Sequence, residues 1–493
     1  EENVDVLVLG GGIAGCWAAI TAAKKGAKVA MIEKGATIRG GAGGSSCEHW
    51  GNAPNPLSPI TPEMCVAQEC LQHKGYCNGL SLYIMARESY GLLLEMEKMG
   101  ATIRDTEDKF KGKAFRDEDT KFLFDYEYEN RLDFRVWGET FKPVLYKECK
   151  RSGVKIYDRI MATSLLTEAG KQGGRVVGAT GLNSRTGQFL IFRAKATIMC
   201  MSKHVRNWNF GTELAGLSGN RPNLAGTGHA MAWRAGATFT EMEKYHERTP
   251  SNIYSFARYT ASSTIDDWEP TRTKPTKGLE FMGGGLVVDW DLKTTLDGLY
   301  AAGDGLFASV SQPHAAATGC YAARKAVLYA KQVSEVRLNR KQIDKEKVRV
   351  YAPTKHDARM DWKELNIGTC RVMQEYCGKS KSDDLLNRGL IWLEEIEQKE
   401  APKLYATNPH SLMRSLEVLD VLTCNQMIMH ASLARKASSS YLNFLRLDYP
   451  QIDPPDWYKW ITIHQENGQV EVGELPIDFW GDLEENYEAH NSA

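Results

Sequence analysis

The sequence has no long apolar segment and no excess of charge of one sign. None of its hydrophobic runs approaches the ~18 residues that a membrane-spanning helix needs. Lysine and arginine together number 61, and aspartate and glutamate number 62, which leaves a formal net charge of −1. Electrostatic binding to nucleic acid or to an anionic membrane surface needs a positive excess. We therefore expect no membrane span and no nucleic-acid partner.

The 11 cysteines are odd in number and form no Cys-x-x-Cys pair. A secreted disulfide framework is therefore not expected, and a reducing, cytoplasmic location is favoured. Cys65, Cys70 and Cys77 cluster, but their spacing fits no zinc or iron–sulfur pattern. We expect these three to be buried, unreactive thiols, and we predict no metal site in this chain. An iron–sulfur cluster that exchanged electrons with this protein would lie on another subunit.

The N-terminal segment has the pattern of a dinucleotide-binding unit. Residues 5–9 are an apolar run suited to a buried parallel strand, and Gly10, Gly12 and Gly15 follow with Gly-x-Gly-x-x-Gly spacing. The first glycine turns the chain, the second lets backbone amides approach a pyrophosphate, and the third lets the helix pack closely on the strand. A helix over residues 14–25 is expected to follow.

A second strand over residues 27–32 completes the unit and ends at an acid. Glu33 stands eighteen residues after Gly15, where a carboxylate accepts hydrogen bonds from ribose hydroxyls. An acid there disfavours a 2′-phosphate, so the pattern predicts FAD or NAD rather than NADP. Further cofactor contacts are expected at Ile13, Ala14 and Lys34.

A glycine-rich loop, residues 39–46, comes soon after the acid. It is too rich in glycine for a helix or a central strand. Its position predicts that the backbone amides of Gly40, Gly41 and Gly44 and the hydroxyls of Ser45 and Ser46 face the phosphates and the flavin.

The remaining segments predict an α/β protein with an inserted meander. Helices are expected over residues 62–72, 82–99 and 135–150, and residues 102–130 read as hairpin or surface. A short strand over 153–157 precedes three β segments over 164–168, 174–182 and 188–195, and a separate strand over 196–201 returns to the parent sheet. Helical stripes recur over 340–445, and the aromatic segment 454–480 reads as irregular.

These motifs together resemble the succinate dehydrogenase and fumarate reductase flavoprotein superfamily. The resemblance rests on the order of the fingerprint, the meander and four later blocks: PNLAGTGHAMAWRAGA at 222–237, MGGGLVV at 282–288, GLYAAGD at 298–304 and RLDYP at 446–450. It implies FAD rather than NAD, because the block ending at Gly303 and Asp304 is similar to the second flavin-contacting motif of that superfamily. Thr318 and Gly319 are further contacts that it implies.

Two departures from the superfamily carry predictions. Covalent members have a histidine in the serine-rich loop, whereas here His49 comes a few residues late, so we expect non-covalent FAD. The superfamily also inserts a capping domain of roughly a hundred residues. Here His246 and Met282 are only 36 residues apart, so the cap is expected to be reduced to a short segment. The flavin is then either more open or covered by residues 50–130, by the C-terminal region or by a partner chain.

The resemblance also suggests catalytic residues. His246 matches the substrate-contacting histidine, but Thr318 and Leu279 replace an arginine and a histidine of fumarate reductases, so fumarate and succinate chemistry are disfavoured. The segment at 312–320 is more similar to the adenylylsulfate reductase α subunit, whose active-site histidine matches His314. Arg248 is a candidate anion contact, and Arg258 and Arg272 could supply a further cation.

We thus expect a FAD-binding Rossmann-like domain of the glutathione-reductase type with a meander, a short cap and a helical C-terminal domain. The expected boundaries are 1–245 and 283–335 for the FAD domain, 246–282 for the cap, 336–445 for the helices and 446–493 for a tail. The expected function is a catalytic subunit that exchanges electrons between a small polar or anionic substrate and an iron–sulfur subunit. A stand-alone flavin oxidase or enoate reductase is the alternative, and a non-catalytic flavin- or nucleotide-binding module remains open.

Overall fold

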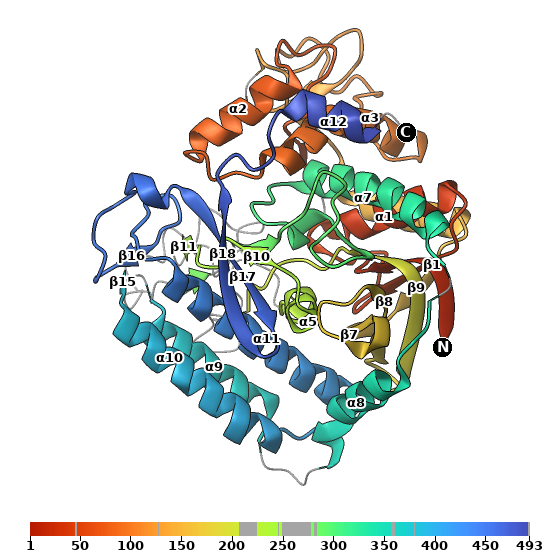
Figure 1. The fold of residues 1–493 in the computed structure, drawn as a ribbon. Coiled ribbons are helices and arrows are strands. Elements are labelled where there is room, and N and C mark those ends of the chain that lie inside the picture. The colour runs from red at the N-terminus through yellow and green to blue at the C-terminus, as the bar shows by residue number, and fades with distance from the viewer. Residues whose placement is uncertain are drawn as a thin grey trace, which may run out of the picture.

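The structure is a computed structural model (Figure 1). It describes residues 1–44, 47–126, 128–206, 224–244, 246–248, 278–280, 283–334, 336–355, 360–378 and 380–491. In these ranges no helix is long and apolar enough to cross a membrane.

A seven-stranded mixed sheet forms the centre of the molecule. Its order is β6-β2-β1-β9-β8-β7, and β14 pairs in parallel with the carboxyl half of β9. The strands span Glu2–Leu9 (β1), Val29–Glu33 (β2), Lys155–Asp158 (β6), Ile160–Thr167 (β7), Val176–Asn183 (β8), Phe189–Met199 (β9) and Leu299–Ala301 (β14). Strand β1 lies between β2 and β9 and is parallel to both, and its carboxyl half is fully buried. The carboxyl ends of β1, β2, β9 and β14 therefore meet at one edge of the sheet.

Helices cover one face of this sheet (Figure 1). Helix α1 packs against α7, α7 packs against α3, and α4 packs against α1. Their bounds are Ile13–Lys24 (α1), Gly79–Lys98 (α3), Phe141–Arg151 (α4) and Gln312–Gln332 (α7). Small residues allow the close approach of α1 and α7, because a Cβ built on Gly319 would lie 2.4 Å from the carbonyl oxygen of Ala14.

The meander is confirmed, but its last part differs from the prediction. Residues 188–195 and 196–201 were expected as two strands, and they form the single strand β9. Its amino half pairs antiparallel with β8, and its carboxyl half runs parallel to β1. One continuous strand serves both pairings because nothing in residues 189–199 turns the chain. The predicted helix at 135–150 is also shorter, since α4 begins at Phe141, after the short strand Phe134–Arg135 (β5).

Residues 47–135 form a lobe beside the sheet. It contains α2 (Pro62–Gln72), α3 and a small sheet in the order β3-β5-β4, of His49–Trp50, Phe134–Arg135 and Leu123–Phe124. The expectation of three inert thiols was wrong for two of them, because Cys70 and Cys77 form a disulfide with Cα atoms 5.6 Å apart. Helix α2 ends just after Cys70, and the positive φ angles of Lys74 and Gly75 fold the chain back toward α3. Cys65 is a buried free thiol.

A helical region follows α7, as the residue pattern predicts. It comprises Arg340–Tyr351 (α8), Trp362–Tyr376 (α9), Asp383–Glu395 (α10) and Pro409–Ala434 (α11), with a two-strand pair of Ser380–Lys381 (β15) and Leu445–Arg446 (β16). Helix α11 packs against α9, α10 and α5, which spans Thr227–Ala235. Helix α5 also contacts β7, so it connects the helical region with the seven-stranded sheet, hereafter the cofactor sheet.

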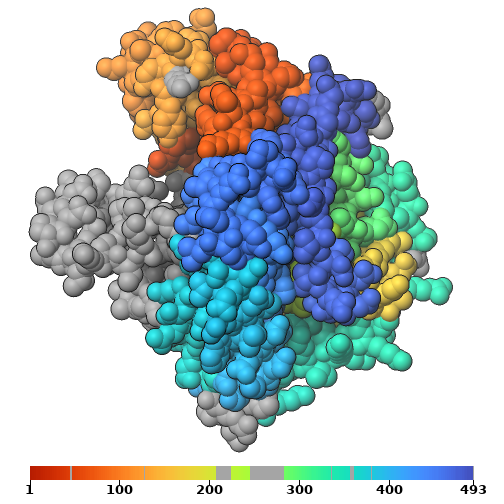
Figure 2. Space-filling model, turned by 60° about the vertical axis from the view of Figure 1, so that its left-hand side comes forward, coloured from red at the N-terminus to blue at the C-terminus, as the bar shows by residue number. Residues whose placement is uncertain are grey.

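The C-terminal segment is ordered, although the sequence predicts an irregular one. Lys459–Glu466 (β17) and Gln469–Pro476 (β18) form a hairpin, and β17 pairs with Phe239–Thr240 (β10), which also pairs with Gly285–Leu286 (β13). Leu483–Asn491 (α12) then packs on α3. Figure 2 shows this segment in blue, lying between the α2–α3 region in orange and α10 in cyan. The sequence does carry a strand signal that the prediction missed, because β17 holds the apolar Trp460, Ile461 and Ile463, and Val470 and Val472 alternate with polar residues in β18.

Candidate functional site

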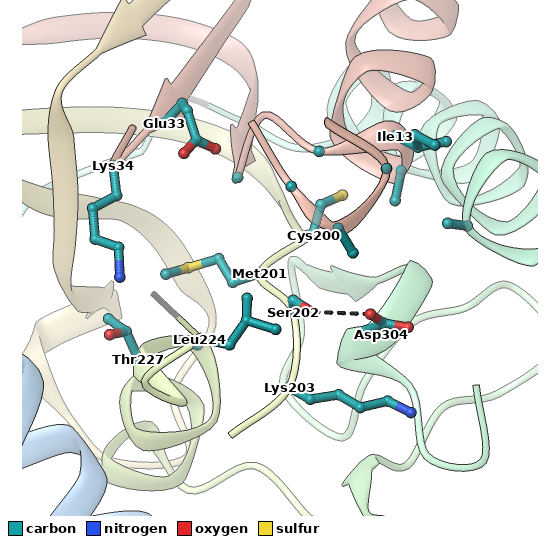
Figure 3. Close-up of a pocket in the computed structure, with 18 of the residues that line it drawn as sticks. Ile13, Glu33, Lys34, Cys200, Met201, Ser202, Lys203, Leu224, Thr227 and Asp304 are labelled. Carbon is teal, nitrogen blue, oxygen red and sulfur yellow. Dashed lines mark hydrogen bonds between the residues drawn. The ribbon is translucent and has the colours of Figure 1, made fainter. Parts of the chain in front are cut away.

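One cavity lies at the carboxyl edge of the parallel strands (Figure 3). Its walls come from the turns after β1, β2, β9 and β14, from the loop at 41–43 and from the start of α7. The lining residues include Gly10, Gly12, Ile13, Ala14, Glu33, Lys34, Gly41, Met201, Ser202, Lys203, Thr227, Asp304, Ser311 and Gln312. Eight residues predicted to contact the cofactor are therefore brought together around one space.

The glycines of the fingerprint allow a close approach of backbone to backbone. Gly10 has a φ of +99°, and a Cβ on Gly15 would lie 1.8 Å from the carbonyl oxygen of Gly10. Gly41, with a φ of +81°, packs so closely on Gly12 that a Cβ there would lie 2.7 Å from the Gly12 Cα. The amino end of α1 therefore opens into the cavity without side chains in front of it. This geometry suits a pyrophosphate, because free N–H groups and the helix dipole both favour an anion.

Two charged side chains fix the turn at residues 10–12, hereafter the phosphate loop. The Gly11 amide donates to Glu33 Oε2 at 2.7 Å, and the Gly35 amide donates to Glu33 Oε1 at 2.7 Å. The Nζ atom of the buried Lys142 donates to the Gly11 carbonyl oxygen at 2.5 Å and to Cys16 Sγ at 3.1 Å. Each carboxylate oxygen of Glu33 keeps a lone pair for a ribose hydroxyl. Lys142 is a functional residue that the sequence reasoning missed.

Lys34 at the same end of the cavity takes part in a buried charge cluster. Its Nζ donates to Glu417 Oε1 on α11, and Arg206 and Arg414 each donate to Glu417 Oε2 at 2.7 Å. Burial alone would raise the pKa of Glu417, but the three cations overcome it and lower this pKa to about 2. The cluster fixes Lys34 beside the cavity and ties α11 to the cofactor sheet.

Asp304 stands at the opposite end of the cavity (Figure 3). Its carboxylate accepts hydrogen bonds from the Ser202 hydroxyl at 2.9 Å and from the Ser309 hydroxyl at 3.0 Å. Burial raises the pKa of Asp304, but the charge of Lys203 and these two hydroxyls outweigh burial and lower it. Asp304 is therefore an anion that keeps acceptor capacity toward the cavity.

Thr318 and Gly319 lie inside α7 and act on the cavity through their neighbours. The Thr318 hydroxyl accepts from the Gly303 amide at 2.9 Å and donates to the His314 carbonyl oxygen at 2.6 Å. It therefore joins the turn before Asp304 to the first turn of α7. Gly303 also packs on α1, because a Cβ built there would lie 2.9 Å from the Ala14 Cβ. Gly15, Gly40 and Gly44 likewise shape the chain around the cavity through close backbone contacts.

His314 lies in the first turn of α7 and is completely buried. Neither of its ring nitrogens has a hydrogen-bond partner in the described part of the chain. Burial lowers its pKa to about 4, with Asp304 opposing that shift. Its neighbours Gln312 and Ala315 line the cavity. A neutral imidazole with two unsatisfied nitrogens at this place can still donate to or accept from a group bound in the cavity.

Two further buried histidines were not foreseen. His204 and His229 have ring centroids 4.7 Å apart, and burial lowers the pKa of each, that of His229 to about 4. Together with Ser202 and Lys203, His204 directly follows the carboxyl end of β9. The rule that ligands bind beyond the carboxyl ends of parallel strands is the signal that could have found this segment.

Several predicted residues lie outside the described part of the chain. Ser45, Ser46, Arg258 and Arg272 are among them, and so are the side chains of His246 and Arg248. Only the backbone of the expected cap is described in part, as an antiparallel pair of His246–Arg248 (β11) and Gly278–Glu280 (β12). His49, the late histidine, has its Nδ1 2.6 Å from Asp125 Oδ2 and is not among the described residues that line the cavity.

The donor set of the cavity fits FAD. An acid with free lone pairs stands at one end, an exposed helix amino terminus lies in the middle, and a second acid stands at the other end. These match a ribose, a pyrophosphate and a ribityl chain in order.

Comparison with known families agrees with this geometry. A model of the "FAD binding domain" matches residues 5–255, and a model of the "Fumarate reductase flavoprotein C-term" matches residues 369–482. The chain belongs to the succinate dehydrogenase and fumarate reductase flavoprotein family. FAD is therefore the cofactor of this flavoprotein, which belongs to a family of FAD-binding oxidoreductases.

Curated relatives of this flavoprotein share about a quarter of the aligned residues. One chain of the fumarate reductase (CoM/CoB) of Methanothermobacter marburgensis is 25% identical over 52% of this chain and 44% of the relative. The alpha chain of the adenylylsulfate reductase of Megalodesulfovibrio gigas is 24% identical over 49% of this chain and 36% of the relative. The matched region thus spans less than half the length of either relative.

Solved structures show the same fold over nearly the whole flavoprotein. The adenylylsulfate reductase of Archaeoglobus fulgidus superposes with a TM-score of 0.81 at 19% identity, covering 96% of both chains. The E. coli quinol fumarate reductase superposes with a TM-score of 0.74 at 17% identity, covering 96% of both chains. The likeness at this identity concerns the fold.

Proposed function

We propose that this flavoprotein is the catalytic subunit of an enzyme that exchanges electrons between a small polar or anionic substrate and an iron–sulfur subunit. Its relatives include adenylylsulfate and fumarate reductases. The observation that carries the proposal is His314, a buried neutral imidazole whose two ring nitrogens have no partner among the described residues. Its helix neighbours Gln312 and Ala315, though not His314 itself, line the cavity. Such an imidazole serves a reaction at the cofactor better than it serves the core, because an orphaned buried polar atom costs stability.

The residues of the cavity have separate roles in this proposal. Glu33 and the amino end of α1 bind the cofactor, and Asp304 orients its ribityl chain. FAD supplies the electron chemistry when it is bound. His314 donates a hydrogen bond to a bound anion or moves a proton at its ring nitrogens. His246 and Arg248 stay proposed substrate contacts, on the family resemblance alone.

The substrate class differs from that of ordinary fumarate reductases in this proposal. Thr318 stands where the resemblance places a carboxylate-binding arginine, and its hydroxyl is committed to the Gly303 amide and the His314 carbonyl. A threonine in that bonding state cannot replace a bidentate guanidinium. We therefore favour a substrate other than fumarate or succinate.

An iron–sulfur partner belongs to the same proposal. So does a cytoplasmic location, which the nine free cysteines favour, although the Cys70–Cys77 disulfide does not. Among the described residues, no group of three or more His, Cys, Asp and Glu side chains could hold a metal ion. Electrons that leave the flavin therefore need an acceptor that the described part of this chain does not contain.

Composition of the native protein tests the partner. The protein is purified anaerobically from its source, and FAD, iron, acid-labile sulfide and polypeptide chains are quantified. We expect one FAD per chain, a second chain and iron in stoichiometric amount. A protein without iron and without a second chain, whose reduced flavin is reoxidised rapidly by air with release of peroxide, would instead be a stand-alone oxidase.

A further inference from the structure

Lys203 places an ammonium group in the cofactor cavity, where one long hydrogen bond is its contact among the described residues. It follows the carboxyl end of β9, lines the cavity and is half-buried (Figure 3). Its hydrogen bond in the described part of the chain is a long one, to the Ser309 carbonyl oxygen at 3.4 Å. Lys34, the other lysine that lines this cavity, is instead ion-paired with Glu417. The ammonium of Lys203 is therefore available to a ligand.

The cavity has a direction that assigns its two ends. Glu33 marks the adenosine end, and the amino end of α1 marks the pyrophosphate. The isoalloxazine ring must then lie beyond Asp304, toward the residues that line the other end. In Figure 3, Glu33 and Lys34 lie on one side of the cavity, and Asp304 and Lys203 lie on the other. Lys203 is thus a lysine of the flavin end.

At the flavin end of the cavity, Lys203 is the charged hydrogen-bond donor among the described residues. Burial lowers the pKa values of His314 and His229 to about 4, so both rings are neutral near pH 7. Thr318 occupies the place of the arginine that the family resemblance implies. The amino terminus of the 21-residue α7 adds only a partial positive charge, and its N-cap Ser311 makes no side-chain cap. Asp304 is held by two hydroxyls, and against the effect of burial the charge of Lys203 lowers its pKa, without a hydrogen bond between these two side chains in the described part of the chain.

We propose that Lys203 stabilises the negative charge that the flavin ring gains on reduction, and so raises the reduction potential of this flavoprotein. Two electrons from the reductant and one proton from solvent leave the ring with one negative charge. An ammonium group beside the ring stabilises that negative charge more than it stabilises the neutral oxidised ring. The proposal gives one side chain a role toward FAD, the cofactor already assigned. It depends neither on the substrate nor on the iron–sulfur partner.

Reductive titration of the FAD-loaded protein tests this role. Lys203→Met and Lys203→Gln remove the charge, and Lys203→Arg keeps it. Lys171→Met is the control, because Lys171 is an exposed lysine that does not line the cavity. The midpoint potential is measured against reference dyes, and the FAD affinity of the apoprotein is measured in parallel. We expect the two neutral variants to have a potential lower by about 30 mV or more, which is tenfold in the equilibrium constant for a two-electron couple. Lys203→Arg and Lys171→Met should keep the potential of the parent.

Two results would overturn the proposal. The first is a midpoint potential in Lys203→Met and Lys203→Gln that equals that of the parent. The second is an equal loss of affinity for oxidised and reduced FAD, which would place the ammonium at the phosphates. If the Met variant does not fold, which thermal unfolding detects, the Gln variant decides. A missing iron–sulfur partner would leave all of these outcomes unchanged.

Discussion

Gly11 is a residue whose two backbone groups are both fixed by side chains from elsewhere in the fold. Glu33 accepts from its amide, and Lys142 on α4 donates to its carbonyl. A Cβ at this position would lie 2.8 Å from Thr37 Oγ1. The phosphate loop is therefore rigid before any cofactor binds, which lowers the entropic cost of binding.

Loss of Lys142 should weaken FAD binding. Lys142→Met removes a charge-assisted hydrogen bond to the loop, and we expect the dissociation constant of FAD to rise roughly tenfold. Titration of the apoprotein followed by flavin fluorescence measures this. Lys381→Met is a matched control, because Lys381 is an equally buried lysine on β15 in the helical region. Unchanged FAD affinity in Lys142→Met would show that the loop holds its shape without the ammonium.

At the scale of elements, helix α11 is joined to the cofactor sheet by Glu417. Its carboxylate is completely buried and forms ion pairs with Lys34, Arg206 and Arg414. An isolated charge in such a place would be costly, but the three cations turn it into a link between elements far apart in sequence.

This link should make stability depend on pH in acid. The folded-state pKa of Glu417 is about 2, below its unfolded value, so its contribution is fully present above about pH 4.5 and is lost as the pH falls toward 2. The contribution is on the order of 3 kcal/mol. Urea unfolding at pH 6 and pH 3 should show a smaller pH dependence in Glu417→Gln than in the parent. An identical dependence in both proteins would contradict the role of this carboxylate.

The contact of α1 with α7 depends on a glycine. Gly319→Ala would place a Cβ 2.4 Å from the Ala14 carbonyl oxygen, so the helices must separate and the amino ends of both must move. We expect a loss of about 1–3 kcal/mol in unfolding free energy, together with weaker FAD binding. Gly91→Ala on α3 is the control, because its Cβ meets nothing within 4 Å and alanine favours a helix. Equal stability of the two variants would mean that α7 adapts freely.

The elements that the sequence predicted are those with local signals. Gly10, Gly12 and Glu33 follow directly from the chemistry of a dinucleotide site, and the structure brings them to one cavity. The pairing of β17 with β10 depends on contacts that no local pattern encodes. Lys142 was missed for the same reason, because its partner lies 131 residues away in the chain. The disulfide of Cys70 with Cys77 is local, but it depends on the turn at Lys74 and Gly75, which was not predicted from the sequence.

In the whole molecule, the C-terminal segment adds a second link between the lobe of residues 47–135 and the rest of the fold, besides the packing of α3 on α7. Strand β17 extends the sheet of β10, and α12 packs on α3. Tyr487 of α12 meets the ring of Tyr83 at 5.6 Å, and Glu488 pairs with Arg87 at 2.7 Å. The lobe of residues 47–135 is thereby fastened to the rest of the chain.

Removal of α12 should loosen this lobe without emptying the cofactor cavity. Truncation after residue 482 deletes the aromatic contact and the ion pair, and we expect the thermal midpoint to fall by a few degrees, since each kcal/mol is worth about 2–4 °C at most for large domains. The flavin spectrum should persist. Tyr487→Phe, which keeps the ring and loses the hydroxyl, should behave almost as the parent. Loss of FAD on truncation would show that α12 supports the cavity itself.

The central claim, that the flavin exchanges electrons with an iron–sulfur partner, is tested most directly by anaerobic photoreduction of the native complex. Flavin and iron–sulfur absorbance are followed together after the light pulse. We expect the flavin to be reoxidised as the iron–sulfur absorbance bleaches, with no oxygen present. A flavin that stays reduced until air is admitted, in a preparation without iron–sulfur absorbance, would contradict it.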